Sequence, residues 1–97
     1  MEFRRGSTPT LTFPTGDLTT ATVIVSLSQD GAVQVEYSTA DLTLTSSSVS
    51  VTLTQEDTFR FAEGVCYGQV KYKSGTNVGY YPIEKIMVLK ALNEDVM

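Results

Sequence analysis

The chain contains no histidine, no tryptophan and a single cysteine among its 97 residues. Histidine is the side chain whose unperturbed pKa lies near neutral pH, so nucleophiles of the Ser-His and Cys-His kind are excluded. One thiol without any imidazole also argues strongly against a zinc site. No glycine-rich phosphate loop is present. We therefore expect no enzyme, no cofactor and no metal.

Acidic residues could still act in pairs, because a glycosidase needs only two carboxyl groups facing a cleft. The adjacent pairs Glu56-Asp57 and Glu94-Asp95 do not fit this role, since neighbouring side chains diverge on a helix or a strand. They are better interpreted as charges at a helix start and as an acidic tail. A calcium loop needs several oxygen ligands around a glycine, and Asp30-Gly31 supplies only one.

Positive charge is also scarce, because seven basic residues stand against eleven acidic ones and the net charge is -4. The basic residues are dispersed, whereas a nucleic-acid footprint needs them clustered, so no nucleic-acid partner is expected. No apolar run approaches the roughly 20 residues of a membrane helix, and no membrane partner is expected. No signal sequence is recognisable. The lone Cys66 cannot form an internal disulfide, which leaves the redox compartment open and favours the cytoplasm as the site of synthesis.

Serine and threonine make up much of the polar content, and they alternate with apolar residues in a period of two. This pattern is typical of strands with one buried and one solvated face. Turn residues separate the alternating runs every 8 to 12 residues or so. The runs lie at residues 10–13, 21–28, 32–38, 42–44, 48–54, 65–73 and 78–89.

The stretch from Ser46 to Phe61 combines a strand, a helix start and a core segment. Val49, Val51 and Leu53 alternate with hydroxyl residues, and the alternation then stops at Thr54. The side chain of Thr54 can cap a first helical turn three residues ahead of Asp57, as in a capping box. A short helical crossover near residues 55–60 is predicted, with Phe59 and Phe61 placing one or both rings on the core.

Asp30-Gly31 lies between two alternating runs, which indicates a type I′ hairpin turn with two positive φ angles. On the returning strand the pattern predicts that Val33, Val35 and Tyr37 point inward. Pro82 has no backbone N–H group, so the last strand should lie at a sheet edge there or bulge around the proline.

These features predict an all-β protein with a single antiparallel β-sandwich of the immunoglobulin-like type and about seven strands. A small β-barrel is the alternative. The sandwich domain is expected over residues 10–92. Residues 1–9 are expected to form a flexible N-terminal arm, and residues 93–97 an acidic C-terminal tail.

Tyrosines are the remaining candidates for a binding site. Tyr72 is expected in the core. A core position for one of Tyr80 and Tyr81 is the alternative to an interface role. Tyr67 and Tyr81 are candidate interface residues, because exposed aromatic rings anchor protein partners or stack on sugars. The absence of tryptophan weakens the sugar-binding version. Cys66 is expected to be a small buried hydrophobic residue.

Four motifs carry a resemblance that spans nearly the whole chain. They are Arg4-Arg5-Gly6-Ser7-Thr8-Pro9-Thr10, Ser28-Gln29-Asp30-Gly31, Val51-Thr52-Leu53-Thr54-Gln55-Glu56-Asp57-Thr58-Phe59-Arg60-Phe61 and Leu92-Asn93-Glu94-Asp95-Val96. In order and spacing they resemble a family of small structural proteins associated with the tail or baseplate of phages and prophages of Gram-positive bacteria. The sequence departs from that family at Tyr80-Tyr81-Pro82.

The resemblance implies a non-enzymatic virion structural protein of the tail, baseplate or an adaptor, which binds other virion proteins and itself. A carbohydrate- or cell-surface-binding module, with a glycan as partner, is the alternative function. The candidate interface residues are Arg4, Arg5, Thr8, Pro9, Tyr67, Tyr81 and Pro82. Deletion of residues 1–9 is expected to leave folding intact and to weaken assembly.

Overall fold

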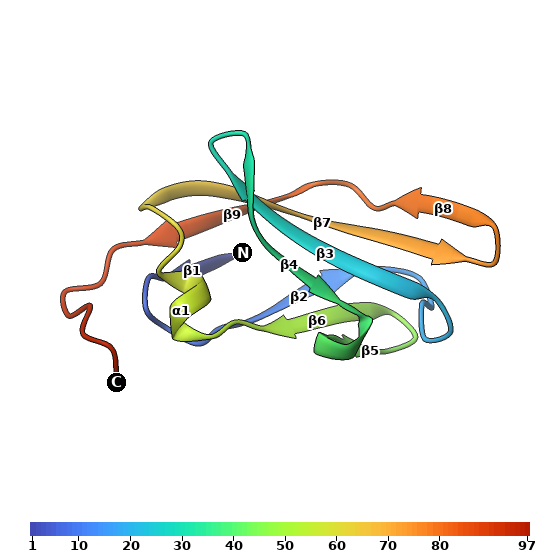
Figure 1. Cartoon of the computed structure of the whole chain (residues 1–97), viewed down its shortest axis with the longest axis horizontal. Coiled ribbons are helices and arrows are strands. Elements are labelled where there is room, and N and C mark those ends of the chain that lie inside the picture. Colours follow the sequence, from blue (N-terminus) through green and yellow to red (C-terminus); the bar gives the residue numbers. More distant parts are fainter.

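Two β-sheets face each other in the structure, a computed structural model that describes residues 1–97 (Figure 1). The strands are β1 (Glu2–Arg4), β2 (Thr10–Pro14), β3 (Thr22–Gln29), β4 (Ala32–Ser38), β5 (Thr43–Leu44), β6 (Ser48–Thr52), β7 (Gly64–Ser74), β8 (Asn77–Tyr80) and β9 (Glu84–Leu89). A 3-10 turn (Thr39–Asp41) precedes β5, and the helix α1 (Gln55–Thr58) connects β6 to β7.

The order of the strands is that of an immunoglobulin-like sandwich. The larger sheet runs β1-β9-β7-β3-β4, with β8 also paired to β7, and the smaller sheet runs β2-β6-β5. In the usual letters of this fold, β2, β6 and β5 take the places of B, E and D, and β4, β3, β7 and β9 those of C′, C, F and G. The predicted sandwich is confirmed, and the two separate sheets exclude the closed barrel.

The predicted turn between β3 and β4 is present. Asp30 and Gly31 have φ angles of 54° and 80°, as a type I′ turn requires. The predicted inward orientation of Val33 on the returning strand is wrong, however. The register shifts after Leu27, so that Leu27 lies opposite Val35 while Ser28 lies opposite Val33. This bulge turns Val33 outward, and the side chain predicted to be buried is 57% exposed.

The predicted last strand is two strands that lie along the same edge of β7. β8 pairs with the second half of β7 and β9 pairs with the first half. Pro82 lies in the irregular connection between them, as its missing N–H predicts. Tyr81 keeps one hydrogen bond there, from its backbone N–H to the carbonyl of Val70 at 3.0 Å.

The prediction of a flexible arm over residues 1–9 is wrong for the structure that these residues adopt. Glu2–Arg4 forms β1, which runs parallel to β9, so the larger sheet is mixed rather than antiparallel. Phe3 is buried against Phe61, with the ring centroids 5.7 Å apart in an edge-to-face arrangement. The backbone carbonyl of Pro9 accepts a hydrogen bond from the N–H of Leu53 at 2.9 Å. Alternation over three residues was too short a signal to predict this strand.

The core lies between the sheets. It consists of side chains from the strands and from the connections between them. As predicted, Cys66 and Phe61 are buried, and the hydroxyl of Thr54 caps α1 by accepting from the N–H of Asp57 at 3.2 Å. The core residues are Phe3, Leu11, Phe13, Leu18, Ala21, Val23, Val25, Leu27, Tyr37, Val49, Val51, Leu53, Phe61, Cys66, Val70, Ile86 and Val88. Cys66 on β7 is free and buried, whereas antibody domains have a disulfide between strands B and F.

Candidate interaction surfaces

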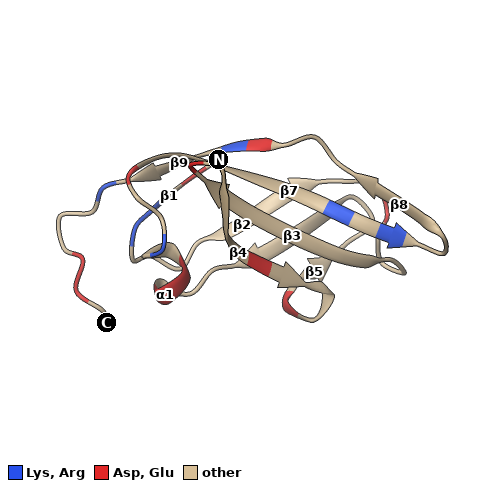
Figure 2. Cartoon of the chain, turned by 45° about the horizontal axis from the view of Figure 1, so that its top comes forward, with Lys and Arg blue, Asp and Glu red and all other residues tan.

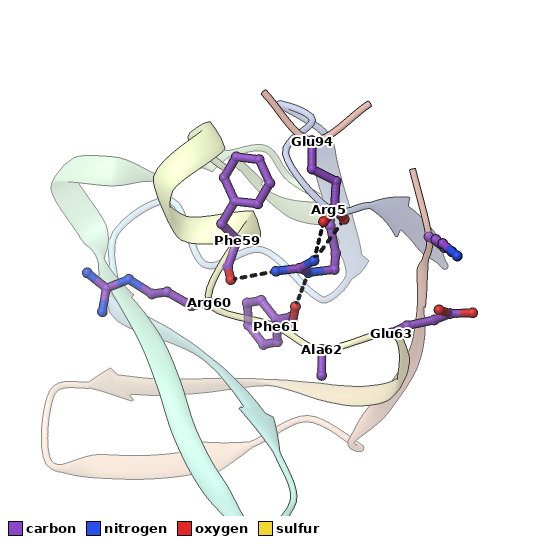
Figure 3. A pocket seen from close by; sticks show the side chains of 8 residues that line it. Arg5, Phe59, Arg60, Phe61, Ala62, Glu63 and Glu94 are labelled. Atoms are coloured by element: carbon purple, nitrogen blue, oxygen red, sulfur yellow. Dashed lines mark hydrogen bonds and ion pairs between the residues drawn. The ribbon is translucent and has the colours of Figure 1, made fainter. Parts of the chain in front are cut away.

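A hollow of about 480 Å³ lies at the end of the sandwich that holds α1, Arg5 and the C-terminal segment (Figure 3). Its centre is the guanidinium group of Arg5. Nε of Arg5 donates to the carbonyl of Phe61 at 2.7 Å, and Nη1 donates to both carboxylate oxygens of Glu94 at 2.7 and 2.8 Å. The guanidinium also lies over the ring of Phe59, 5.6 Å from its centroid. Arg5 therefore ties the N-terminal segment, the connection after α1 and the C-terminal segment together.

The segment after β1 is also held by Thr58 of α1. The hydroxyl of Thr58 donates to the carbonyl of Ser7 at 2.9 Å and accepts from the N–H of Gly6 at 3.0 Å. Because these bonds lie inside one chain, Arg5 and its neighbours are already occupied in the monomer. The hollow also contains Arg60, Lys90 and Glu63, so its charge is mixed.

A second surface is the solvent-facing side of the larger sheet, which we call the outer face. It exposes four large apolar side chains, three of which line one depression. Tyr67 on β7 is 46% exposed, Ile83 is 60% exposed, and Met87 on β9 is 37% exposed. The outward-turned Val33 joins them. Tyr67, Val33 and Ile83 line a shallow depression of about 120 Å³ together with Ser26, Ser28 and Gln69.

The outer face continues toward the β7–β8 hairpin. Val78 lies opposite Lys73, and Tyr80 lies opposite Lys71, whose ammonium group is 5.3 Å from the centroid of the Tyr80 ring. Both apolar side chains are exposed. Basic and apolar side chains are therefore interspersed on this face, and Figure 2 shows the blue bands along β7 and at the start of β9.

The smaller sheet presents a different surface to solvent. Its outward positions carry hydroxyl groups that pair across the strands, with Thr10 bonded to Thr52 at 2.8 Å and Thr12 to Ser50 at 3.0 Å. None of its outward positions carries an exposed large apolar side chain. The apolar surface of the sandwich therefore belongs to the larger sheet.

The seven predicted interface residues do not form one surface in the structure. Arg4 is exposed at the edge of the larger sheet, where Nη1 donates to the carbonyl of Lys90 at 2.7 Å. Thr8 is exposed, whereas Pro9 is half-buried. Pro82 is exposed in the connection between β8 and β9. Tyr67 alone among the seven lies in the apolar part of the outer face.

Tyr81 lies on the opposite side of the larger sheet from Tyr67. Its ring packs against Tyr72 with centroids 5.5 Å apart, and its hydroxyl accepts from the N–H of Gly16 at 2.9 Å. Tyr72 packs against the core as the sequence predicts, whereas Tyr81, a candidate interface residue, is partly buried beside it. Tyr67 and Tyr81 do not form the shared exposed platform that a sugar-binding site would need.

Sequence reasoning missed Val33, Ile83, Met87 and Glu94. Alternation placed Val33 inside, and only the bulge reverses it. Met87 could have been found, because it lies opposite Val65 on the face that the pattern of β7 leaves outside. Nothing in the sequence indicates that Glu94 meets Arg5, which is 89 positions away along the chain.

Two buried groups have shifted pKa values. Burial raises the pKa of the Cys66 thiol to about 11. Burial and a hydrogen bond to Asp57 raise the pKa of Tyr37, whose hydroxyl donates to Oδ2 of Asp57 at 2.8 Å. Every buried side-chain nitrogen or oxygen has a hydrogen-bond partner.

No group of three or more Cys, Asp and Glu side chains is placed to hold a metal ion. The structure contains no helix with the length and apolar character needed to cross a membrane.

No protein-family model matches the chain, and no curated protein matches it. Among solved structures, the chain is similar to a crystal structure described as a strand-swapped dimer of the immunoglobulin-like domain of mouse leukocyte-associated immunoglobulin-like receptor 1. The two chains are 18% identical, with a TM-score of 0.49 over 93% of this chain and 88% of the other. The assignment of the fold rests on the strand order described above.

Proposed function

We propose that this protein is a non-enzymatic structural component of a phage or prophage virion. It would act in the tail, at the baseplate or as an adaptor, by binding other virion proteins and further copies of itself. In this proposal it is made in the bacterial cytoplasm and ends in the particle. The observation that carries the proposal is the outer face of the larger sheet, where Tyr67, Val33, Ile83 and Met87 are exposed together.

Such a face supports a binding role for physical reasons. Exposed single apolar residues are ordinary, but several on one face of a sheet leave apolar area in water that a partner can cover. Burial of such area stabilises a complex by about 25 cal/mol per Å² before the costs of association. Tyr67 is suited to be the anchor, because an aromatic ring with a polar hydroxyl is typical of the centre of interfaces.

The edges of the sheets give a second kind of contact. β4 ends the larger sheet on one side, and β2 and β5 end the smaller one. The outer backbone groups of an edge strand can pair with an extended segment of a neighbour. The bulge on β4 limits this edge, since an irregular edge strand resists pairing. The outer face is therefore the stronger candidate.

Particle composition tests the proposal directly. Particles purified from a strain that produces the protein are expected to contain it, as detected by mass spectrometry. The variant Tyr67→Asp places a charge in the apolar face and is expected to fold but to be depleted from the particles. Thr52→Asp, on the outer side of the smaller sheet, is the matched control and should be incorporated normally. Absence of the unaltered protein from the particles would refute the proposal.

A further inference from the structure

We propose that the C-terminal segment (residues 91–97) of one copy docks on the outer face of the larger sheet of a second copy. The inference deepens the proposed function, on which it rests, by naming a partner for the outer face. The contact joins two different surfaces, so it is head-to-tail rather than symmetric. Repetition of such a contact produces a ring or a filament of copies.

The distribution of exposed apolar side chains is the first support. The structure exposes ten large apolar residues, and nine of them fall into two groups. Six lie on the outer face, namely Val33, Tyr67, Val78, Tyr80, Ile83 and Met87. Three lie on the C-terminal segment, namely Leu92, Val96 and Met97, and Leu92 and Met97 have no cover at all. Contact between the two groups would remove both from water.

Charge is the second support. The outer face carries Lys71, Lys73, Lys85 and Arg4 against Glu2 and Glu36, a balance of +2 on a chain whose net charge is -4. The C-terminal segment carries Glu94 and Asp95 and no basic residue. Figure 2 shows the blue bands on the sheet and the red stretch on the terminal segment. The segment is thus an acidic apolar ligand for a basic apolar face.

The third support is the weak hold of this segment on its own chain. Its polar ties to the body are the ion pair between Glu94 and Arg5 and the hydrogen bond from the N–H of Met97 to Oε1 of Gln55 at 3.2 Å. An ion pair at the surface contributes roughly 0–1 kcal/mol. No apolar side chain of the segment is buried against the body. Release of the segment therefore costs little.

The path of the chain favours a second copy over the same copy. The segment leaves β9 at the end of the molecule that holds α1 and turns toward this helix (Figure 1). The β7–β8 hairpin, with Lys73 and Val78, lies at the opposite end. Seven fully extended residues span about 25 Å. The molecule is 45 Å long, so a segment that starts at one end can reach Lys73 and Val78 only on a neighbouring copy.

Mass measurements on the full chain test the inference. Light scattering after size-exclusion chromatography is expected to show a mass that rises with protein concentration and falls with added salt. The pair Leu92→Ser and Val96→Ser removes the apolar side of the segment. The pair Lys71→Glu and Lys85→Glu reverses charge on the outer face. Each double variant is expected to weaken self-association by roughly tenfold or more, which corresponds to about 1.4 kcal/mol.

A mixture of the two double variants is the decisive measurement. One retains an intact face and the other an intact segment, so the mixture should form a complex of two copies and no larger species. Thr10→Ser with Thr52→Ser, on the smaller sheet, is the matched control and should associate like the unaltered chain. Circular dichroism and thermal unfolding establish that every variant is folded.

Three outcomes overturn the inference: an unaltered chain that is monomeric at every concentration, variants that associate normally, or a mixture that stays monomeric. Incorporation of the protein into particles is a separate measurement, and it tests the proposed role in the virion. Conversely, a protein that self-associates through this contact and is absent from particles refutes the proposed function and keeps the docking contact.

Discussion

At the scale of single residues, alternation predicts burial well wherever a strand is regular. Val23, Val25 and Leu27 are buried as expected, and so is Cys66 on β7. Gly68 is a different case, because its role is the absence of a side chain. A Cβ atom there would lie 2.9 Å from Cδ2 of Leu27 and from two ring carbons of Phe13. The two sheets approach one another closely at this glycine.

We therefore expect Gly68→Ala to destabilise the fold by about 1–3 kcal/mol, because the added methyl group overpacks a buried contact. Urea unfolding followed by circular dichroism measures the change. Lys71→Ala, three positions along β7 and directed to solvent, is the control and should change stability by less than about 0.5 kcal/mol. Equal stability of Gly68→Ala and the unaltered protein would show that the core relaxes freely at this point.

Cys66 gives a prediction for pH. Its thiol has a pKa raised from 9.0 to about 11, because burial disfavours the charged thiolate. The folded state therefore holds its proton more tightly than the unfolded state does, and the stabilisation is complete below pH 9 and is lost as pH rises toward 11. The expected loss is on the order of 2 kcal/mol.

The measurement is the free energy of unfolding in urea across this pH range. Cys66→Ala is expected to be less stable at pH 7 but to lose less stability on going to alkaline pH. The two proteins share every other titratable group, so the comparison between them isolates the thiol. If the free energy of unfolding fell equally with pH in the two proteins, the alkaline loss of stability would not come from the Cys66 thiol.

At the scale of elements, each predicted run contains a strand, but β1 was not predicted and the last run is divided into β8 and β9. β1 has three residues, too few for alternation to be distinguished from chance, and its partner β9 lies more than 80 positions away. The sequence also gives no signal for the bulge opposite Leu27 and Ser28. Its effect is nevertheless large, because it places Val33 on the outer face.

β1 is a structural element of the sandwich, so we expect Phe3→Ala to lower the free energy of unfolding by about 3 kcal/mol. Phe3 is buried and packs edge-to-face on Phe61. Glu2→Ala is the control, because Glu2 is exposed on the same strand. Denaturant unfolding of the three proteins checks the prediction. If Phe3→Ala were as stable as Glu2→Ala, β1 would not contribute to stability, and residues 1–9 would again be best described as a flexible arm.

This result also changes the deletion experiment that the sequence suggested. Removal of residues 1–9 takes away Phe3, Arg5 and the bonds to Thr58 together. A loss of assembly in that deletion could then reflect unfolding. Single substitutions on the outer face are the cleaner test of assembly.

At the scale of the whole molecule, Arg5 links three segments that are far apart in sequence. We expect Glu94→Ala to cost less than about 1 kcal/mol, because a partly exposed ion pair is screened by solvent. Arg5→Ala should cost more, about 1–3 kcal/mol, since the part-buried carbonyl of Phe61 loses its donor.

Thermal unfolding at low and high salt distinguishes the two effects. Added salt should narrow the difference between Glu94→Ala and the unaltered protein, while the deficit of Arg5→Ala should persist. Arg60→Ala is a useful control, because Arg60 makes only long surface ion pairs with Glu56 and Asp57. Equal stabilities of Arg5→Ala and Arg60→Ala would contradict the role assigned to Arg5.

The sequence by itself determined the β-rich sandwich, the Asp30-Gly31 turn, the cap at Thr54 and the burial of Cys66, because each depends on short-range periodicity or on the chemistry of one turn. Only the tertiary structure decided the parallel β1–β9 pairing, the outward rotation of Val33 and the meeting of Arg5 with Glu94. These features depend on contacts between distant segments and on one extra residue in a strand pairing, and local pattern carries no information on either. On the outer face, the exposure of Tyr67 was predicted from the sequence, whereas the exposure of Val33 follows only from the strand pairing.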